Sequence, residues 1–172
     1  MITIVVTGPE STGKTMISEF LAKKLGGVWI PEFARDYMSK LDRSYKYSDL
    51  EIIARTQIEQ RKEAEARSKG YLILDTWLII TKIWFIEVYG RFPDWIEETI
   101  KKQPVDLYLL CEPDIPWVPD PLRENGGERR KYLFGKYLDE IKKTGVPFEV
   151  VAGVDEARYN NVLSKVKLHY MN

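Results

Sequence analysis

The sequence predicts an α/β fold in which a mostly parallel, five-stranded sheet carries helices on both faces. Short apolar runs alternate with longer helical patterns along the whole chain, which is typical of this three-layer arrangement. The length of 172 residues fits a single domain, 1–172, and 44% hydrophobic with 30% charged residues is ordinary for a globular chain. No internal repeat or linker divides the sequence.

Each element follows from a local pattern. Runs of apolar, mostly β-branched residues predict strands at Ile2–Thr7, Val28–Ile30, Tyr71–Leu74, Leu107–Cys111 and Phe148–Val151. Helical patterns predict helices at Lys14–Leu25, Glu32–Lys40, Asp49–Ser68, Leu78–Tyr89, Pro93–Lys102, Glu128–Lys143 and Glu156–Tyr170. Ser48, followed by Glu51, is expected to cap the third helix. Gly90 and Gly145 stand just past two expected helix ends.

The octapeptide from Gly8 to Thr15 is the most informative motif. It reads Gly-Pro-Glu-Ser-Thr-Gly-Lys-Thr, fits the P-loop pattern G-x-x-x-x-G-K-[ST], and joins the first predicted strand to the first predicted helix. Backbone N–H groups and the positive end of a helix surround nucleotide phosphates in such a loop. Lys14 can reach the β- and γ-phosphates, and the Thr15 hydroxyl can bind Mg²⁺. The motif predicts a nucleoside triphosphate site formed by Gly8, Glu10, Ser11, Thr12, Gly13, Lys14 and Thr15.

Carboxylates follow the second and third predicted strands. Asp75 comes directly after Leu74, where P-loop proteins place an aspartate that holds Mg²⁺, although a carboxylate there can also cap the next helix. Glu32 and Asp36 lie four residues apart, with Arg35 between them. Either acid can accept the proton of an attacking hydroxyl or bind a sugar diol. The alternative is that both acids only stabilise a helix N-terminus.

The segment from about 113 to 130 is expected to form a lid. It holds four prolines and two glycines, which exclude regular structure, and it follows a predicted strand at the sheet edge where α/β folds bind ligands. Arg123, Arg129 and Arg130 lie near its end. Arginines on a closing lid stabilise the charge that develops in phosphoryl transfer. The alternative is a solvated basic surface paired with neighbouring glutamates.

Three tryptophans stand at strand ends or in the lid segment. Trp29, Trp77 and Trp117 are therefore candidates for holding an aromatic or cationic ring of a substrate. Packing in the core is the ordinary alternative for each of them.

Composition argues against several other functions. The formal net charge is zero, so no general basic field would recruit nucleic acid. His169 is the only histidine and Cys111 the only cysteine, so we expect no Ser-His-Asp triad, internal disulfide or Cys/His metal site. Since no run is long enough to span a membrane and no signal peptide is evident, we expect a cytoplasmic protein.

Taken together, these segments resemble the ribosylnicotinamide kinase domain of the NadR family. The matching pieces run in order across nearly the whole chain: Gly8–Thr15, Pro31–Tyr37, Ser48–Leu50 with Gln57, Leu74–Thr76, Tyr89–Gly90 and Trp117–Arg123. The resemblance implies a P-loop kinase that transfers the γ-phosphate of ATP to the ribose 5′-hydroxyl of nicotinamide riboside, giving nicotinamide mononucleotide.

With this resemblance, the candidate residues take specific roles. We expect catalytic roles for Lys14, Glu32, Asp36 and Arg123, Mg²⁺ ligands from Thr15 and Asp75, and a contact of Arg129 with ATP. Contacts with the nucleoside are expected from Glu32, Arg35, Asp36, Asp75, Trp77 and Trp117.

Two alternatives stay open. The family usually reads Asp-Thr-Asp after the third strand, whereas this chain reads Asp75-Thr76-Trp77, so a kinase for another nucleoside or nucleotide is one alternative. A P-loop ATPase or switch without a small-molecule acceptor is the other, although the Asn-Lys-x-Asp motif of GTPase switches is absent. The sequence does not indicate the oligomeric state.

Overall fold

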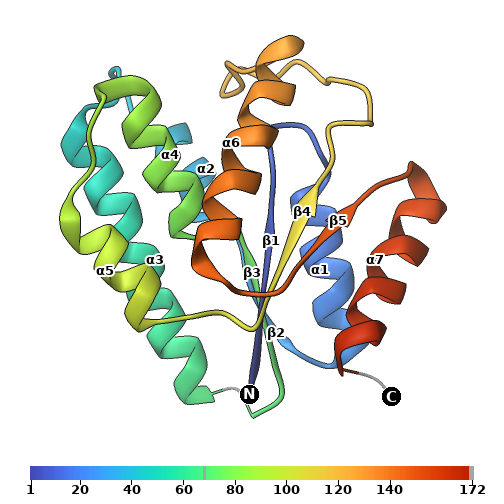
Figure 1. Ribbon diagram of the computed structural model, residues 1–172. Helices are drawn as coiled ribbons and strands as arrows, with labels where there is room; N and C mark the ends of the chain where they lie inside the picture. Colours follow the sequence, from blue (N-terminus) through green and yellow to red (C-terminus); the bar gives the residue numbers. More distant parts are fainter. Residues whose placement is uncertain (68, 171–172) are drawn as a thin grey trace.

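Five strands form one parallel sheet in the computed structural model, which describes residues 1–67 and 69–170 (Figure 1). The strands are β1 (Ile2–Thr7), β2 (Val28–Ile30), β3 (Tyr71–Asp75), β4 (Leu107–Cys111) and β5 (Phe148–Val151). Their spatial order is β2-β3-β1-β4-β5, and every neighbouring pair is parallel. The predicted fold class is therefore confirmed, and β3 differs from its expected bounds only by including Asp75.

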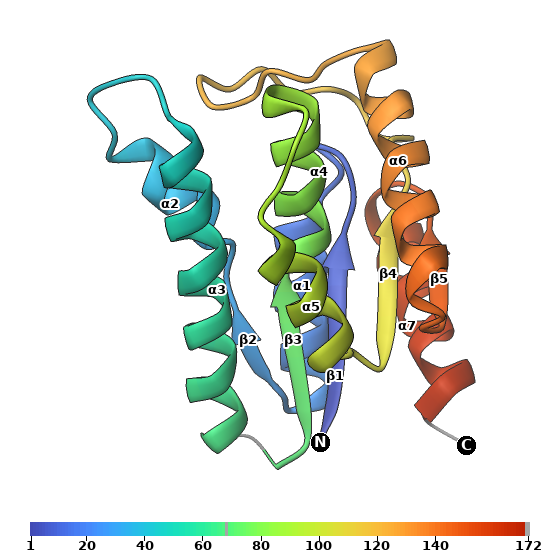
Figure 2. The same cartoon turned by 60° about the vertical axis from the view of Figure 1, so that its left-hand side comes forward.

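Helices cover both faces of the sheet (Figures 1 and 2). They are α1 (Lys14–Leu25), α2 (Phe33–Ser39), α3 (Tyr47–Arg67), α4 (Leu78–Tyr89), α5 (Asp94–Lys102), α6 (Glu128–Thr144) and α7 (Asp155–Tyr170). α1 and α7 pack on one face, and α3, α4, α5 and α6 pack on the other. All the expected helices are present, and the expected end of the third one, Ser68, lies outside the described residues.

The core has two parts, one on each face of the sheet. Ile4 and Val6 of β1 belong to the cluster under α1 and α7, whereas Val5 belongs to the cluster under the other helices. Neighbouring residues of a strand point to opposite faces, so a sheet buried on both sides needs apolar residues at every position. This is why the strands read as continuous apolar runs in the sequence.

A buried carboxylate fixes α2, a short helix with no buried residue of its own. Asp49 of α3 accepts hydrogen bonds from the Tyr37 hydroxyl (2.7 Å), the Arg43 guanidinium (2.7 and 2.9 Å) and the Lys46 N–H (2.6 Å). Hydrogen bonds from Arg43 and Tyr37 hold the pKa of Asp49 far below its usual range. The predicted cap was wrong: α3 begins at Tyr47, so Ser48 lies inside it and Asp49 provides the capping oxygen.

The first strand and the last helix meet at one residue. The Asp106 carboxylate accepts a hydrogen bond from the Thr3 N–H (2.7 Å), and its backbone carbonyl accepts one from the Tyr170 hydroxyl (2.9 Å). Asp106 precedes β4, so this junction lies at the amino-terminal edge of the sheet. In the described part of the chain, the helices are too short or too polar to cross a membrane.

Candidate active site

The P-loop joins β1 to α1 at the carboxyl edge of the sheet. Gly8 has φ 141°, and a Cβ there would lie 2.7 Å from the carbonyl oxygen of Cys111, so only glycine fits. Ser11 and Gly13 also have positive φ, 55° and 74°, which curves the backbone into a concave nest of N–H groups. α1 begins at Lys14, so the positive end of the helix faces the same space. This geometry suits a polyphosphate.

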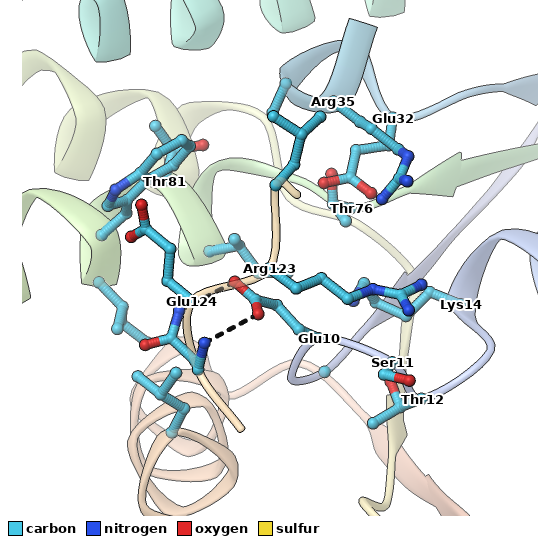
Figure 3. Close-up of a pocket in the computed structure, with 18 of the residues that line it drawn as sticks. Glu10, Ser11, Thr12, Lys14, Glu32, Arg35, Thr76, Thr81, Arg123 and Glu124 are labelled. Atoms are coloured by element: carbon cyan, nitrogen blue, oxygen red, sulfur yellow. Dashed lines mark hydrogen bonds between the residues drawn. The ribbon is translucent and has the colours of Figure 1, made fainter. Parts of the chain in front are cut away.

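A cavity of about 480 Å³ extends from the P-loop to α2, α3, α4 and α6 (Figure 3). Its lining includes many of the residues expected from the sequence: Gly8, Glu10, Ser11, Thr12, Gly13, Lys14, Thr15, Glu32, Arg35, Arg123 and Arg129. The Lys14 ammonium donates to the carbonyl oxygen of Pro9 (2.8 Å) within the loop. The cavity therefore joins the phosphate-binding loop to the space lined by α2, α3, α4 and α6, which we call the second chamber.

Asp75 lies at the end of β3, paired in register with Val6 just before the P-loop. Its side chain is only 2% exposed, and both carboxylate oxygens lack a hydrogen-bond partner among the described residues. Burial raises the pKa of Asp75 to about 6. Asp75 is not among the residues that line the cavity, but the Thr15 hydroxyl does line it and lies close enough to Asp75 to oppose part of this rise in pKa. A divalent cation would compensate for the buried charge, so these two residues fit Mg²⁺.

Glu32 and Asp36 lie in different environments in the structure. Glu32 directly precedes α2 and lines the cavity, whereas Asp36 is exposed and pairs with Lys40 (2.7 Å) outside the lining. Arg35 also lines the cavity, and its guanidinium forms an ion pair with Asp120. Figure 3 shows Glu32 and Arg35 next to each other on one wall of the cavity.

The lid, residues 112–127 between β4 and α6, is held against the cavity from several sides (Figure 2). The Glu10 carboxylate accepts hydrogen bonds from the backbone N–H (3.0 Å) and the side-chain amide (2.9 Å) of Asn125. Glu10 thus connects the P-loop with the lid. Beyond the lid, Arg129 pairs with Glu87 of α4 (2.5 Å). Arg123 donates to the Val118 carbonyl within the lid (2.5 Å) and reaches the cavity.

The structure does not bring the three candidate tryptophans to the cavity lining. Trp29 donates to the Ser18 hydroxyl of α1 (3.1 Å). Trp77 is buried, with the Arg61 guanidinium 5.0 Å from the centre of its ring. Trp117 packs inside the lid against Gly126.

Other aromatic and polar residues, which sequence reasoning missed, form the second chamber. Trp84 donates from Nε1 to the Tyr45 hydroxyl (3.2 Å), and their ring centres lie 5.1 Å apart. The chamber is also lined by Met38, Gln57, Thr76, Ile80, Thr81, Ile83, Glu87, Val88, Leu133 and Tyr137. Among these, only Gln57 and Thr76 belonged to segments quoted for the family resemblance. α4 is apolar on most of its surface, so its residue pattern does not indicate which face lines a cavity.

Comparisons with known proteins agree with this geometry. A family model described as "AAA domain" matches residues 3–158. The trifunctional NAD biosynthesis/regulator protein NadR of Salmonella typhimurium is 28% identical over 171 residues, which cover 96% of this chain and 42% of that protein. The chain therefore spans less than half of the length of this relative.

Solved structures share the fold. A crystal structure of NadR protein in complex with NR has a TM-score of 0.79 and 21% identity, covering 98% of this chain and 51% of that chain. A deoxyadenosine kinase from M. mycoides has a TM-score of 0.66 and 18% identity, covering 97% of this chain and 100% of that chain. The resemblance to NadR seen in the sequence is confirmed, and the fold is that of P-loop kinases.

Proposed function

The chain belongs to the family that the AAA-domain model describes, and we propose that it is an ATP-dependent kinase for nicotinamide riboside. In this reaction the ribose 5′-oxygen attacks the γ-phosphorus of ATP, the bond to the β–γ bridging oxygen breaks, and ADP leaves. The products are nicotinamide mononucleotide and ADP. The sequence relationship to NadR, whose name refers to NAD biosynthesis, supports this choice of acceptor.

One observation carries the proposal: the P-loop opens into a second chamber beneath a lid. An ATPase or a switch needs only the phosphate site and a partner surface, whereas a small-molecule kinase needs a place for the acceptor next to the γ-phosphate. The cavity of about 480 Å³ includes both parts. A lid that excludes water also limits hydrolysis of ATP in place of transfer.

The phosphate side of the reaction depends on positioning and charge. The P-loop N–H groups and Lys14 bind the phosphates, and Arg123 approaches from the lid. Thr15 and Asp75 would hold Mg²⁺, which when bound neutralises phosphate charge during transfer. Since phosphoryl transfer is largely dissociative, the protein needs to supply little activation of the nucleophile.

On the acceptor side, one acid and one amide of the cavity wall are our candidates for contacts with the nucleoside. Glu32 lines the cavity and is our candidate for accepting the proton of the 5′-hydroxyl. The Gln57 amide donates to the Thr76 hydroxyl (3.3 Å) and accepts from the Thr81 hydroxyl (3.2 Å). A second N–H and an oxygen lone pair of Gln57 suit the carboxamide of nicotinamide. Tyr45 and Trp84 supply aromatic faces for the cationic pyridinium ring.

A coupled assay of ADP release tests the proposal. Purified protein and MgATP are mixed with nicotinamide riboside, its carboxylate analogue nicotinic acid riboside, adenosine, cytidine or thymidine, and products are identified by mass. We expect stimulation by nicotinamide riboside and formation of the mononucleotide, without NAD. Stimulation only by another nucleoside would support the alternative acceptor, and constant hydrolysis without any acceptor would support an ATPase.

A further inference from the structure

Two buried arginines contact the P-loop from outside the cavity. Arg130 of α6 and Arg158 of α7 are 6% and 4% exposed. Arg130 Nη2 donates to the Ser11 carbonyl (2.7 Å), and Arg158 Nη2 donates to the Thr12 carbonyl (3.0 Å). Arg130 was expected among the lid arginines that face the phosphates, but its guanidinium lies behind the loop.

These two contacts fix two consecutive peptide groups. The Ser11 carbonyl and the Thr12 N–H belong to one peptide, and the Thr12 carbonyl and the Gly13 N–H belong to the next. In a trans peptide the carbonyl and the N–H point in opposite directions, and the described chain has no cis peptide bond. A guanidinium that holds a carbonyl on the outer side therefore holds the N–H of the same peptide toward the phosphate site.

Both guanidiniums are themselves anchored in neighbouring loops. Arg158 Nη1 pairs with Asp114 (2.6 Å) and donates to the Gly153 carbonyl (2.8 Å), which follows β5. Arg130 Nη1 donates to the Ile115 carbonyl of the lid (3.0 Å). The P-loop is thus held in place through the loops that follow β4 and β5.

This arrangement lowers stability in two ways. The Nε–H groups of Arg130 and Arg158 are buried without a hydrogen-bond partner in the described part of the chain. Ser11 is not glycine, yet its φ is 55°. Unpaired buried donors and a left-handed non-glycine residue each cost free energy, and such costs concentrate at functional sites.

We propose that Arg130 and Arg158 are positioning residues of the phosphate site. They orient the Thr12 and Gly13 N–H groups for the phosphates of ATP without touching ATP themselves. The proposal rests on the nucleotide-binding part of the proposed function and not on the identity of the acceptor. Loss of one well-aligned hydrogen bond to a charged phosphate weakens binding by roughly 10- to 100-fold, so loss of this orientation should weaken nucleotide binding.

Arg61 offers a matched control for lysine substitutions. It is 5% exposed and donates to the carbonyls of Gln103 (2.8 Å) and Pro104 (3.0 Å), away from the P-loop. The variants Arg130→Lys, Arg158→Lys and Arg61→Lys each keep a charge and lose the planar fork that binds two or more carbonyls at once. Affinity for MgADP is measured by calorimetry without an acceptor, and the thermal midpoint is measured without nucleotide.

We expect the dissociation constant for MgADP to rise by about 10- to 100-fold in the Arg130 and Arg158 variants. All three variants should have lower thermal midpoints, whereas the Arg61 variant should keep the wild-type dissociation constant within about twofold. Folded Arg130 and Arg158 variants with wild-type affinity would overturn the proposal. So would an equal loss of affinity in the Arg61 variant, because the effect would then reflect stability alone.

A measurement on the wild type covers the case of variants that do not fold. The guanidinium NMR signals of Arg130 and Arg158 should shift when MgADP is added, and those of Arg61 should not. Unchanged signals of Arg130 and Arg158 at saturating MgADP would overturn the proposal. A wild type that binds MgADP but does not phosphorylate nicotinamide riboside would refute only the acceptor.

Discussion

Replacing Asp75 with asparagine should stabilise the nucleotide-free protein while abolishing turnover with MgATP. The carboxylate is buried, and its oxygens lack partners among the described residues. In the absence of a cation, the folded state therefore contains a charge that water would solvate better. Asparagine keeps the shape of the side chain and removes the charge, so it relieves this penalty and also removes a ligand that we assign to Mg²⁺.

The size and sign of the effect follow from the pKa. Burial raises the pKa of Asp75 from 3.8 to about 6, so the folded state binds more protons than the unfolded state between these two values. The free-energy cost of burying the charged carboxylate is absent below about pH 4, grows as the pH rises, and is complete above about pH 6. A difference of about two pKa units corresponds to about 3 kcal/mol of unfolding free energy at pH 8, and to about half of that at pH 5.

Urea unfolding of both proteins in EDTA at pH 5 and pH 8 measures this difference directly. Comparing the variant with the wild type isolates Asp75 from the other carboxylates, since both proteins share them. Turnover is measured separately with MgATP. The reasoning is refuted if the asparagine variant is no more stable than the wild type at pH 8, or if its advantage does not shrink at pH 5.

Three further predictions concern the cavity. Lys14→Ala should keep the fold and lose more than about nine tenths of kcat, because this lysine is expected to bind the phosphates in the transition state. A tenfold loss corresponds to about 1.4 kcal/mol of transition-state stabilisation, and a smaller loss would contradict the P-loop assignment. Glu32→Gln should lower kcat by about 10²–10⁴-fold if Glu32 is the base. Asp36 lies outside the cavity, so Asp36→Asn should have the kcat of the wild type. If both variants have the wild-type kcat, the two acids only stabilise the N-terminus of the helix. Asp120→Asn, which breaks the exposed pair with Arg35, should lower kcat by less than about fivefold in steady-state assays, and a larger loss would mean that this pair controls lid closure.

The P-loop was predictable because its information is contiguous. Glycines, a lysine and a threonine at fixed spacing determine the backbone, and the backbone N–H groups form the site. The strands and helices were predictable for a similar reason, since periodicity along the chain reflects burial on one or both faces. Asp75 could be placed because the end of a buried parallel strand is visible in the sequence.

The second chamber was not predictable from the sequence, because elements that are far apart along the chain meet there. Trp77 follows Asp75 closely, yet Thr76 has φ 72°, which threonine rarely adopts, and the chain turns Trp77 toward Arg61 in the interior. Tyr45 and Trp84 line the cavity instead, and their contact depends on how the loop before α3 packs against α4. Tertiary contacts, and not the local residue pattern, determine which face of a helix lines the cavity.

The junction at Asp106 also determines how the protein can be handled. Thr3 and Tyr170 are both bonded to this residue, at the edge of the sheet opposite the P-loop. Figure 1 shows the start of β1 and the end of α7 at the bottom of the view and the lid at the top. A fusion partner, dye or surface tether attached at either end would leave the mouth of the cavity accessible. Immobilised protein should therefore report the same nucleotide affinity whichever end is anchored.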